Sequence, residues 1–335
     1  MMAYARPLPE IQQLARHAEA AGLGTLWLTE SGRTAYLSCA AAALATERIG
    51  LGTAVAVAFP RSPMITAKVA WELAEATGGR FRLGLGTQVR AHIERRYGAE
   101  FDPPGPRMRD YLLALKAIFR GFRGEPLAHE GPYWNLSLLP AMWSPGPIDV
   151  PDPPVDLAAV GPWMLRLAGE LADGLHVHPL NNPTYLSETV LPLLEEGAAK
   201  TGRDVRDITV IVPTFAAPTA DWREMARTQV AFYGSTPNYA FLFEQLGREG
   251  TTQRLRERQK AGDIAGMAAV IDDELLAHFC ISGDWADLSD AIVDRYAGTA
   301  DRVVSYFAGF AWQRDPAALG AWGELARDVI ARTSG

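Results

Sequence analysis

Two titratable side chains stand where predicted buried strands end, which is where a parallel α/β fold commonly does its chemistry. Glu30 follows the apolar run 25–29, and His178 ends a run that begins at Gly174. A carboxylate at the C-terminal end of a barrel strand can act as an acid or base or orient a cofactor, although a helix cap and an ion pair are the alternatives for Glu30. His178 is predicted to contact substrate, whereas His176, on the same strand face, is predicted to be a core histidine.

A third candidate site is the turn at Gly161-Pro162, between a strand that starts at Val155 and a helix. Proline suits the first helical position because its missing N–H would have no intrahelical partner. A helix N-terminus carries roughly +0.5 charge together with unpaired backbone donors, so a phosphate can bind there without a basic side chain. The sequence therefore predicts an anion site at the start of this helix.

Short apolar runs alternate with helical patterns, which is typical of a parallel sheet with crossover helices. The seven predicted strands start at Thr25, Ile49, Phe81, Val155, Gly174, Ile208 and Val303, the last running to Phe310. A barrel needs an eighth strand before the first helix, where Met1–Arg6 leave room for only a very short one. The length of 335 residues suits a closed α/β barrel with insertions. We therefore expect a TIM (β/α)8 barrel whose first strand is short or missing.

Two segments interrupt this alternation. Residues 124–154 lack periodicity and include the proline-rich run SPGPIDVPDPP. Loops of this length inside a compact domain are usually functional, so we expect a lid. Residues 221–296 are predicted to form a mostly helical insert. Both inserts are expected to belong to one domain that spans residues 1–335.

The composition is typical of a soluble globular protein, with 48% hydrophobic and 21% charged residues and no apolar run near the roughly 20 residues of a membrane span. A net charge of −7 without a basic stripe argues against nucleic acid. With only Cys39 and Cys280 present, neither a disulfide framework nor structural zinc is expected. The start of the chain does not resemble a targeting signal, so we expect a cytoplasmic protein with small organic ligands and no membrane partner.

The acidic run Asp272-Asp273-Glu274 is the most obvious candidate for a cation site. It lacks the spacing of a calcium loop, so it is predicted to begin a helix exposed to solvent. No metal site is expected.

The chain resembles the bacterial-luciferase-like superfamily over nearly its whole length. The resemblance rests on the runs GLGTAVAVAFPRSPMITAKVAWELAEATGGRFRLGLGTQVRAHIERRYG, AAVGPWMLRLAGELADGLHVHP and AFYGSTPNY. Within the superfamily, the chain is most similar to the branch that uses the deazaflavin coenzyme F420 in place of FMN. This resemblance implies a TIM barrel with its cofactor at the C-terminal ends of the strands. It also implies a bulged third strand with a non-proline cis peptide within Ala54–Val57.

The resemblance further implies contacts to three parts of the cofactor: two residues at the deazaflavin head, three along the ribityl arm and three at the phosphate. Glu30 and Val57 are expected to contact the deazaflavin head. Thr87, Gln88 and His92 are expected to line the ribityl arm. The amides of Val160 and Gly161, together with Met164, are expected to hold the phosphate. Glu30 and His178 are the residues expected to take part in catalysis.

Two departures from the family pattern narrow the range of expected substrates. Ser31 stands where the sugar-phosphate dehydrogenases of the superfamily have a histidine, and Asn181 stands where they have a lysine that grips the phosphate. A sugar phosphate is therefore not the expected substrate, and the proton donor is left open.

The resemblance implies an oxidoreductase that transfers a hydride between coenzyme F420 and a small organic substrate, and that assembles as a homo-oligomer. Because the deazaflavin reacts poorly with oxygen, a dehydrogenase or reductase is favoured. The alternative is an FMN-dependent luciferase-like monooxygenase. Two further alternatives are a non-catalytic cofactor-binding barrel and an unrelated phosphate-binding barrel isomerase.

Overall fold

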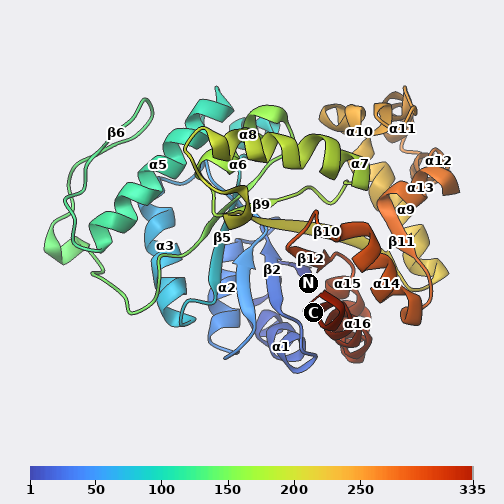
Figure 1. The fold of residues 1–335 in the computed structure, drawn as a ribbon, viewed down its shortest axis with the longest axis horizontal. Coiled ribbons are helices and arrows are strands. Elements are labelled where there is room, and N and C mark those ends of the chain that lie inside the picture. The colour runs from blue at the N-terminus through green and yellow to red at the C-terminus, as the bar shows by residue number, and fades with distance from the viewer. Residues whose placement is uncertain (334–335) are drawn as a thin grey trace. The chain divides into compact units, whose positions relative to one another are not determined.

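The computed structural model describes residues 1–333, in which strands and helices alternate along most of the chain (Figure 1). The chain divides into two compact units. The N-terminal unit consists of residues 1–176 and 193–209, and the C-terminal unit consists of residues 177–192 and the chain from Val210 onward.

The strands of the N-terminal unit form one parallel layer in the order β1-β2-β3-β5-β8-β9, with β4 paired to β5. They are β1 (Met2–Tyr4), β2 (Thr25–Thr29), β3 (Gly50–Thr53), β4 (Ala56–Val57), β5 (Phe81–Gly86), β8 (Val155–Ala158) and β9 (Gly174–His176). Most of their residues are buried, as expected for parallel strands that are covered on both faces.

Helices follow the strands in this unit, and the longest of them, α5, runs beside α3 (Figure 1). The helices are α1 (Leu8–Ala20), α2 (Ala35–Ala43), α3 (Pro63–Ala76), α4 (Arg90–Arg95), α5 (Pro104–Phe122), α6 (Pro162–Leu171), most of α8 (Leu191–Ala199) and the 3-10 helix η3 (Val205–Asp207). Each long helix turns an apolar face inward; α1, for example, buries Ile11, Leu14, Ala15 and Ala18 at helical spacing.

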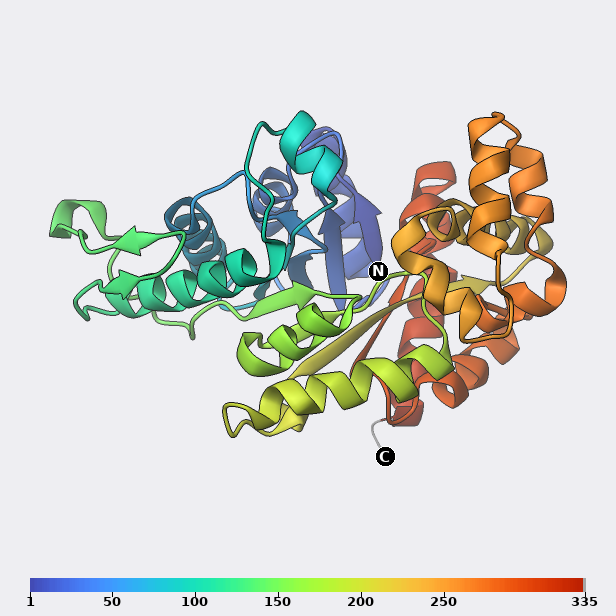
Figure 2. The ribbon, with the colours of Figure 1, turned by 90° about the horizontal axis from the view of Figure 1, so that it is seen from above.

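Residues 124–154 form an arm that extends beyond α5 (Figure 2). The arm contains the hairpin β6 (His129–Glu130) and β7 (Asn135–Leu136) and the 3-10 helix η1 (Ala141–Trp143). The Asp110 carboxylate of α5 accepts hydrogen bonds from the amides of Tyr133 and Trp134, at 2.9 and 3.0 Å. The arm joins the C-terminal end of α5 to the N-terminal end of β8, at the strand ends opposite Glu30. These positions do not support the predicted lid.

In the C-terminal unit, β10 (Thr209–Ala217) pairs in parallel with β11 (Cys280–Ser282) and with β12 (Arg302–Ser305). Helices make up most of the rest: α7 (Pro183–Tyr185), the π-helical turn η2 (Leu186–Val190), α9 (Ala220–Gly234), the 3-10 helix η4 (Pro237–Tyr239), α10 (Ala240–Glu244), α11 (Thr251–Lys260), α12 (Ile264–Ala269), α13 (Asp273–Phe279), α14 (Trp285–Tyr296), α15 (Ala308–Arg314), the 3-10 helix η5 (Pro316–Ala318) and α16 (Leu319–Thr333). β11 was not predicted, because three residues are too few to show a strand periodicity.

The strand missing from the sequence prediction is β1, which pairs Met2 with Trp27 in parallel. With the seven predicted strands, which correspond to β2, β3, β5, β8, β9, β10 and β12, this gives eight. The predicted extent of the last strand was wrong, since β12 ends at Ser305 and the chain is helical from Ala308. The Ser305 hydroxyl accepts a hydrogen bond from the Ala308 amide at 3.3 Å, and this contact favours the start of a helix.

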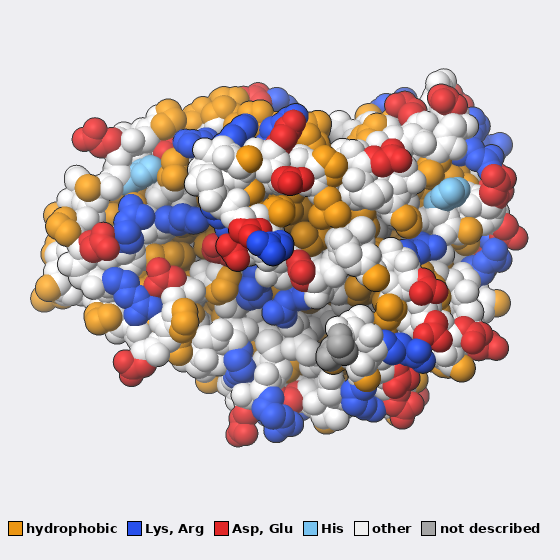
Figure 3. Space-filling view, viewed as in Figure 1, with side chains coloured by type: hydrophobic (Ala, Val, Ile, Leu, Met, Phe, Trp, Pro, Cys, Tyr) orange, Lys and Arg blue, Asp and Glu red, His pale blue; other side chains and the backbone are white. Residues whose placement is uncertain are grey.

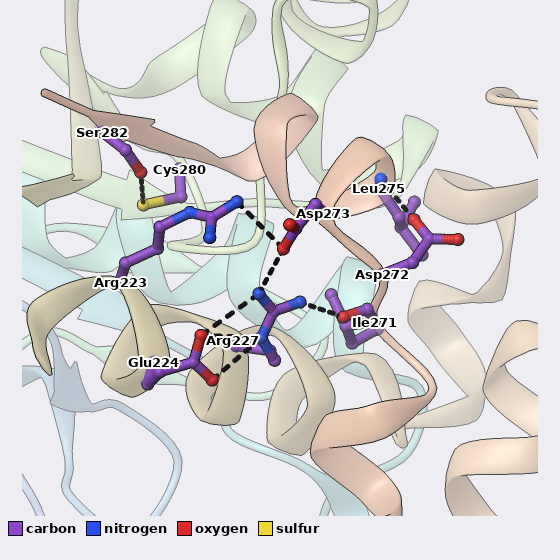
Figure 4. Close-up of polar contacts among 9 residues, drawn as sticks. All are labelled: Arg223, Glu224, Arg227, Ile271, Asp272, Asp273, Leu275, Cys280 and Ser282. Carbon is purple, nitrogen blue, oxygen red and sulfur yellow. Dashed lines mark hydrogen bonds and ion pairs between the residues drawn. The ribbon is translucent and has the colours of Figure 1, made fainter. Parts of the chain in front are cut away.

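The acidic run begins helix α13, as predicted, and its carboxylates are engaged by the protein itself (Figure 4). The Asp272 side chain accepts a hydrogen bond from the Leu275 amide at 2.7 Å. Asp273 pairs with Arg223 and Arg227 of α9, at 2.9 and 2.6 Å. The run therefore caps its own helix and fastens it to α9. Within residues 1–333, no group of three or more His, Cys, Asp and Glu side chains could hold a metal ion.

The surface carries mixed charge. On the face shown in Figure 3, Lys and Arg side chains alternate with Asp and Glu, and apolar side chains lie between them. None of the helices within residues 1–333 combines the length and apolar character that crossing a membrane requires.

Candidate cofactor site

The residues predicted to bind the cofactor lie at the C-terminal ends of neighbouring parallel strands in the N-terminal unit. Glu30 directly follows β2, Thr87 follows β5, and Gly161 follows β8 after a short turn. Val57 ends β4 and pairs with Gly86, the last residue of β5. Because parallel strands end at the same edge of a layer, these residues share one edge, and α/β barrels carry their sites there.

Glu30 is held by a closed ring of hydrogen bonds. Its Oε2 accepts from the Val57 amide and from Arg61 Nη1, both at 3.0 Å, and its Oε1 accepts from Arg61 Nη2 at 2.5 Å. Arg61 Nη1 also donates to the Val57 carbonyl at 2.8 Å. The Glu30 side chain is only 4% exposed. Burial disfavours the charge of the guanidinium, but the hydrogen bonds and the attraction to Glu30 outweigh it and raise the pKa of Arg61.

This ring bears on the two interpretations of Glu30. Both carboxylate oxygens of Glu30 accept hydrogen bonds, and the ion pair that was the alternative interpretation of Glu30 is present. Arg61 lies 31 positions from Glu30 along the chain, so local spacing in the sequence gives no sign of this pair.

The strand between Thr53 and Val57 has the implied bulge. The non-proline cis peptide joins Ala54 to Val55, within the predicted interval. A Cβ atom at Gly86 would lie 2.6 Å from Cγ2 of Val55, so only glycine permits this close approach. The bulge therefore packs directly on the end of β5.

The residues predicted to line the ribityl arm follow β5. Gln88 has a φ of 59°, and it is the only non-glycine residue with positive φ in the described part of the chain. Its Oε1 accepts a hydrogen bond from the Val89 amide, and its carbonyl accepts one from the Thr87 hydroxyl, both at 3.0 Å. His92 is exposed on α4. Left-handed backbone is uncommon outside glycine and tends to cluster at binding sites, which agrees with the role predicted for Gln88.

The predicted anion site is the N-terminus of α6, with Gly161 as the N-cap and Pro162 as the first helical residue. No side chain caps this helix, and its first turn has no acidic residue. The amides of Gly161, Trp163 and Met164 have no hydrogen-bond partner among residues 1–333. A Cβ atom built on Gly161 would meet nothing within 4 Å. The half-buried Val160 and Met164 flank this open space, which has the backbone donors that a phosphate requires.

A buried ion pair lies inside the strand layer. Arg82 donates to Asp156 at 2.5 and 3.0 Å, and His176 Nε2 lies 3.7 Å from the same carboxylate. Burial disfavours the charge of Asp156, but His176 and Arg82 outweigh it and lower the pKa of the carboxyl. His176 also packs edge-on against Trp27, with ring centroids 4.7 Å apart. His176 was predicted to be a satisfied core histidine. Its side chain is buried in the core, but its Nε2 has no hydrogen-bond partner within residues 1–333, so the predicted satisfaction is not found.

Thr29 is a candidate that the sequence did not reveal. Strand alternation puts Thr29 on the same face of β2 as Trp27, one step nearer the C-terminal end. Its hydroxyl is buried and has no hydrogen-bond partner within residues 1–333. A buried polar group without a partner costs about 1–3 kcal/mol, which a bound polar ligand can recover. Threonine is common in strands, so nothing in the sequence distinguishes this one.

His178 belongs to the C-terminal unit. Its Nδ1 accepts a hydrogen bond from the Leu180 amide at 3.0 Å, and its ring contacts Tyr239 and Tyr233, with centroids 4.4 and 4.8 Å apart. Burial lowers the pKa of His178 to about 3. The imidazole is therefore neutral near pH 7 with its proton on Nε2. In this form Nε2 is a hydrogen-bond donor.

The N-terminal unit fits a phosphate-bearing, flavin-like cofactor on three counts. It has an uncapped helix N-terminus at Gly161, an unsatisfied hydroxyl at Thr29 and a strand fixed by Glu30. All three lie at the C-terminal ends of parallel strands.

Comparison with solved structures shows the fold. The structure of coenzyme F420-dependent tetrahydromethanopterin reductase from Methanopyrus kandleri matches with a TM-score of 0.79 at 24% identity, covering 99% of this chain and 98% of that one. The predicted fold class, an α/β TIM barrel of the luciferase-like type, is confirmed.

Sequence comparison shows the family. An uncharacterized protein of Mycobacterium tuberculosis is 39% identical over 308 residues, covering 88% of this chain and 91% of the relative. A protein of the same organism named as a putative coenzyme F420-dependent oxidoreductase is 30% identical over 343 residues, covering 94% and 95%. The family model described as luciferase-like monooxygenase matches residues 1–302. The chain therefore belongs to the luciferase-like monooxygenase family.

Proposed function

We propose that this protein is an oxidoreductase that transfers a hydride between coenzyme F420 and a small organic substrate. Membership of the luciferase-like family supports an oxidoreductase with a flavin or deazaflavin cofactor. Relatives named for F420 favour the deazaflavin. The observation that carries the proposal is the N-terminus of α6, where the amides of Gly161, Trp163 and Met164 have no partner among residues 1–333 and neither an acid nor a side-chain cap is present.

The residues of this chain have separate roles in the proposal. When bound, coenzyme F420 supplies the ring carbon that accepts or delivers the hydride. The amides of Gly161, Trp163 and Met164 bind its phosphate, and Val57 supports its ring system. Glu30 and Arg61 hold Val57 in place, and Gln88 lines the ribityl arm beside Thr87 and His92.

Titration of the purified protein with F420 and with FMN, in separate experiments, tests the choice of cofactor. Changes in absorbance and cofactor fluorescence report binding. We expect micromolar binding of F420 and at least 100-fold weaker binding of FMN. Tight FMN binding with no affinity for F420 would overturn the proposal in favour of the second candidate, an FMN-dependent monooxygenase, which the family description favours.

The variant Glu30→Gln tests whether the ring around Glu30 serves the cofactor. It leaves Arg61 with a weakened partner, so we expect F420 affinity to fall about 10-fold, together with some loss of stability. Glu19→Gln is the matched control, because Glu19 also accepts backbone amides, from Arg48 at 2.6 Å and Ile49 at 2.9 Å, but lies outside the site.

Glu19→Gln should lower stability and leave F420 affinity unchanged. Equal losses of affinity in both variants would mean that Glu30 acts only through global stability. A protein saturated with F420 that oxidises or reduces no member of a broad panel of alcohols, ketones and imines would favour the non-catalytic barrel instead.

A further inference from the structure

Two polar atoms in the C-terminal unit are open to a ligand. His178 Nε2 and the Tyr239 hydroxyl have no hydrogen-bond partner among residues 1–333 and retain accessible surface. The two side chains are in direct contact, with ring centroids 4.4 Å apart. Both atoms therefore belong to one pair of packed rings.

The two side chains are held by different elements of this unit. The Leu180 amide donates to His178 Nδ1 at 3.0 Å, which leaves the imidazole proton on Nε2. Asn181 Nδ2 donates to the carbonyls of His178 and Pro213, both at 2.9 Å, and so fastens this turn to β10. Tyr239 ends the 3-10 helix η4. Nε2 of His178 is thus a fixed donor.

Tyr233 completes an aromatic wall. Its ring meets that of His178 nearly at right angles, at 86°, with the centroids 4.8 Å apart. Its hydroxyl lies 2.7 Å from that of Tyr306, which in turn donates to Gln229 at 3.2 Å. The Tyr233 hydroxyl is therefore occupied, and its ring offers mainly an apolar surface.

The surroundings of this pair are uncharged. Burial alone lowers the pKa of His178 to about 3 and raises the pKa of Tyr239, with no contribution from a charged neighbour. No Lys or Arg in the described chain forms a hydrogen bond or ion pair with either side chain. A carboxylate or phosphate here would be desolvated without a counter-charge, which is costly. A neutral oxygen atom would be accepted.

We propose that His178 and Tyr239 bind the oxygen atom of a neutral carbonyl compound or alcohol, whose apolar part packs on the ring of Tyr233. This inference rests on the proposed function for its meaning as a substrate site, and it adds Tyr239 as a residue that selects the substrate. Both groups donate hydrogen bonds to the oxygen.

Nuclear magnetic resonance of the full chain labelled with ¹⁵N in its six histidine rings tests this site. Acetone, cyclohexanone and acetophenone are the neutral probes, and cyclohexanecarboxylate is the anionic one. We expect at least one ketone to shift the Nε2 signal that His178→Gln removes, while the carboxylate leaves it unchanged. The proposal would be overturned if none of the three ketones shifts the Nε2 signal of His178, or if the carboxylate shifts this signal as much as cyclohexanone does.

Tyr239→Phe removes one hydroxyl and should weaken ketone binding about 5-fold, the value of a single hydrogen bond. Tyr296→Phe is the matched control, because the Tyr296 hydroxyl donates to Thr214 at 3.0 Å in the same unit and lies outside the pair. If Tyr239→Phe and the unmodified protein bind the ketone with equal affinity, Tyr239 is not part of the site.

The two proposals fail separately, because the titration is run both without cofactor and with one equivalent of F420. Ketone shifts in a protein that does not bind F420 would overturn the proposed function and leave this site standing. F420 binding without ketone shifts would overturn the site at His178 and Tyr239 and leave the proposed function standing.

Discussion

Helices α6 and α13 begin in opposite ways. At α13, Asp272 caps the helix through the Leu275 amide, and Asp273 lies in the first turn. At α6, Gly161 supplies no cap, and the first turn has no acid. Both N-termini present the same partial positive charge. The start of α13 is therefore capped by its own chain, whereas the amides of Gly161, Trp163 and Met164 at the start of α6 have no acceptor among residues 1–333.

The proposed phosphate site gives a reason for the missing cap of α6. A cap such as Asp272 stabilises a helix by about 1 kcal/mol, and α6 forgoes that contribution. A carboxylate at position 161 would fill the space that a phosphate needs and would repel it. Introducing or removing an acid at these two positions should therefore have opposite consequences.

The largest expected effect comes from making α6 resemble α13. Gly161→Asp is sterically allowed, since its Cβ would meet nothing within 4 Å. The new carboxylate competes for the free amides and repels the phosphate, with like charges about 4 Å apart costing about 4 kcal/mol at an effective dielectric constant of 20. We expect F420 affinity to fall at least 100-fold in absorbance titrations, while the Tm of the cofactor-free protein rises.

Gly161→Asn is the matched control, because it has the same shape and capping ability without the charge. Its loss of F420 affinity should be at most about 10-fold. Equal losses for the two variants would show that space, and not charge, governs this site.

A smaller effect is expected from removing the cap of α13. Asp272→Ala should lower the free energy of unfolding by about 1 kcal/mol, because the Leu275 amide loses its partner. Denaturant unfolding measures this loss, and F420 titration should give an unchanged affinity. A change in F420 affinity would mean that the two helix starts are coupled.

The smallest effect concerns pH. Hydrogen bonds from Arg227 and the nearby charge of Arg223 lower the pKa of Asp273 below its usual value near 4. A carboxyl whose pKa is lower in the folded state stabilises the fold above the unfolded pKa, and this stabilisation is lost as the pH falls through the folded pKa. Asp273→Asn should therefore be less stable than the unmodified protein at pH 6, with the difference shrinking below about pH 4. A difference that stays constant from pH 6 to pH 3 would contradict this account.

Local patterns in the sequence determined much of the framework. Alternating apolar runs located seven strands, and Pro162 marked the start of α6, because these signals depend only on neighbouring residues. The resemblance located the cis peptide between Ala54 and Val55 and the residues at the strand ends. The boundary at Ser305 was misjudged because the hydroxyl contact that begins α15 competes with a strand-like pattern.

Only the tertiary structure decided which side chains meet. Arg61 reaches Glu30 across 31 positions, and Tyr239 reaches His178 across an even longer stretch of chain, so neither pair has a signature in local spacing. Those contacts occupy both carboxylate oxygens of Glu30, and a separate contact to the Leu180 amide leaves Nε2 of His178 as the donor nitrogen. The sequence by itself placed the groups at the strand ends. The protonation of these groups, and whether their polar atoms are free to bind a ligand, depend on burial and on partners that folding brings together. Only the tertiary structure decides both.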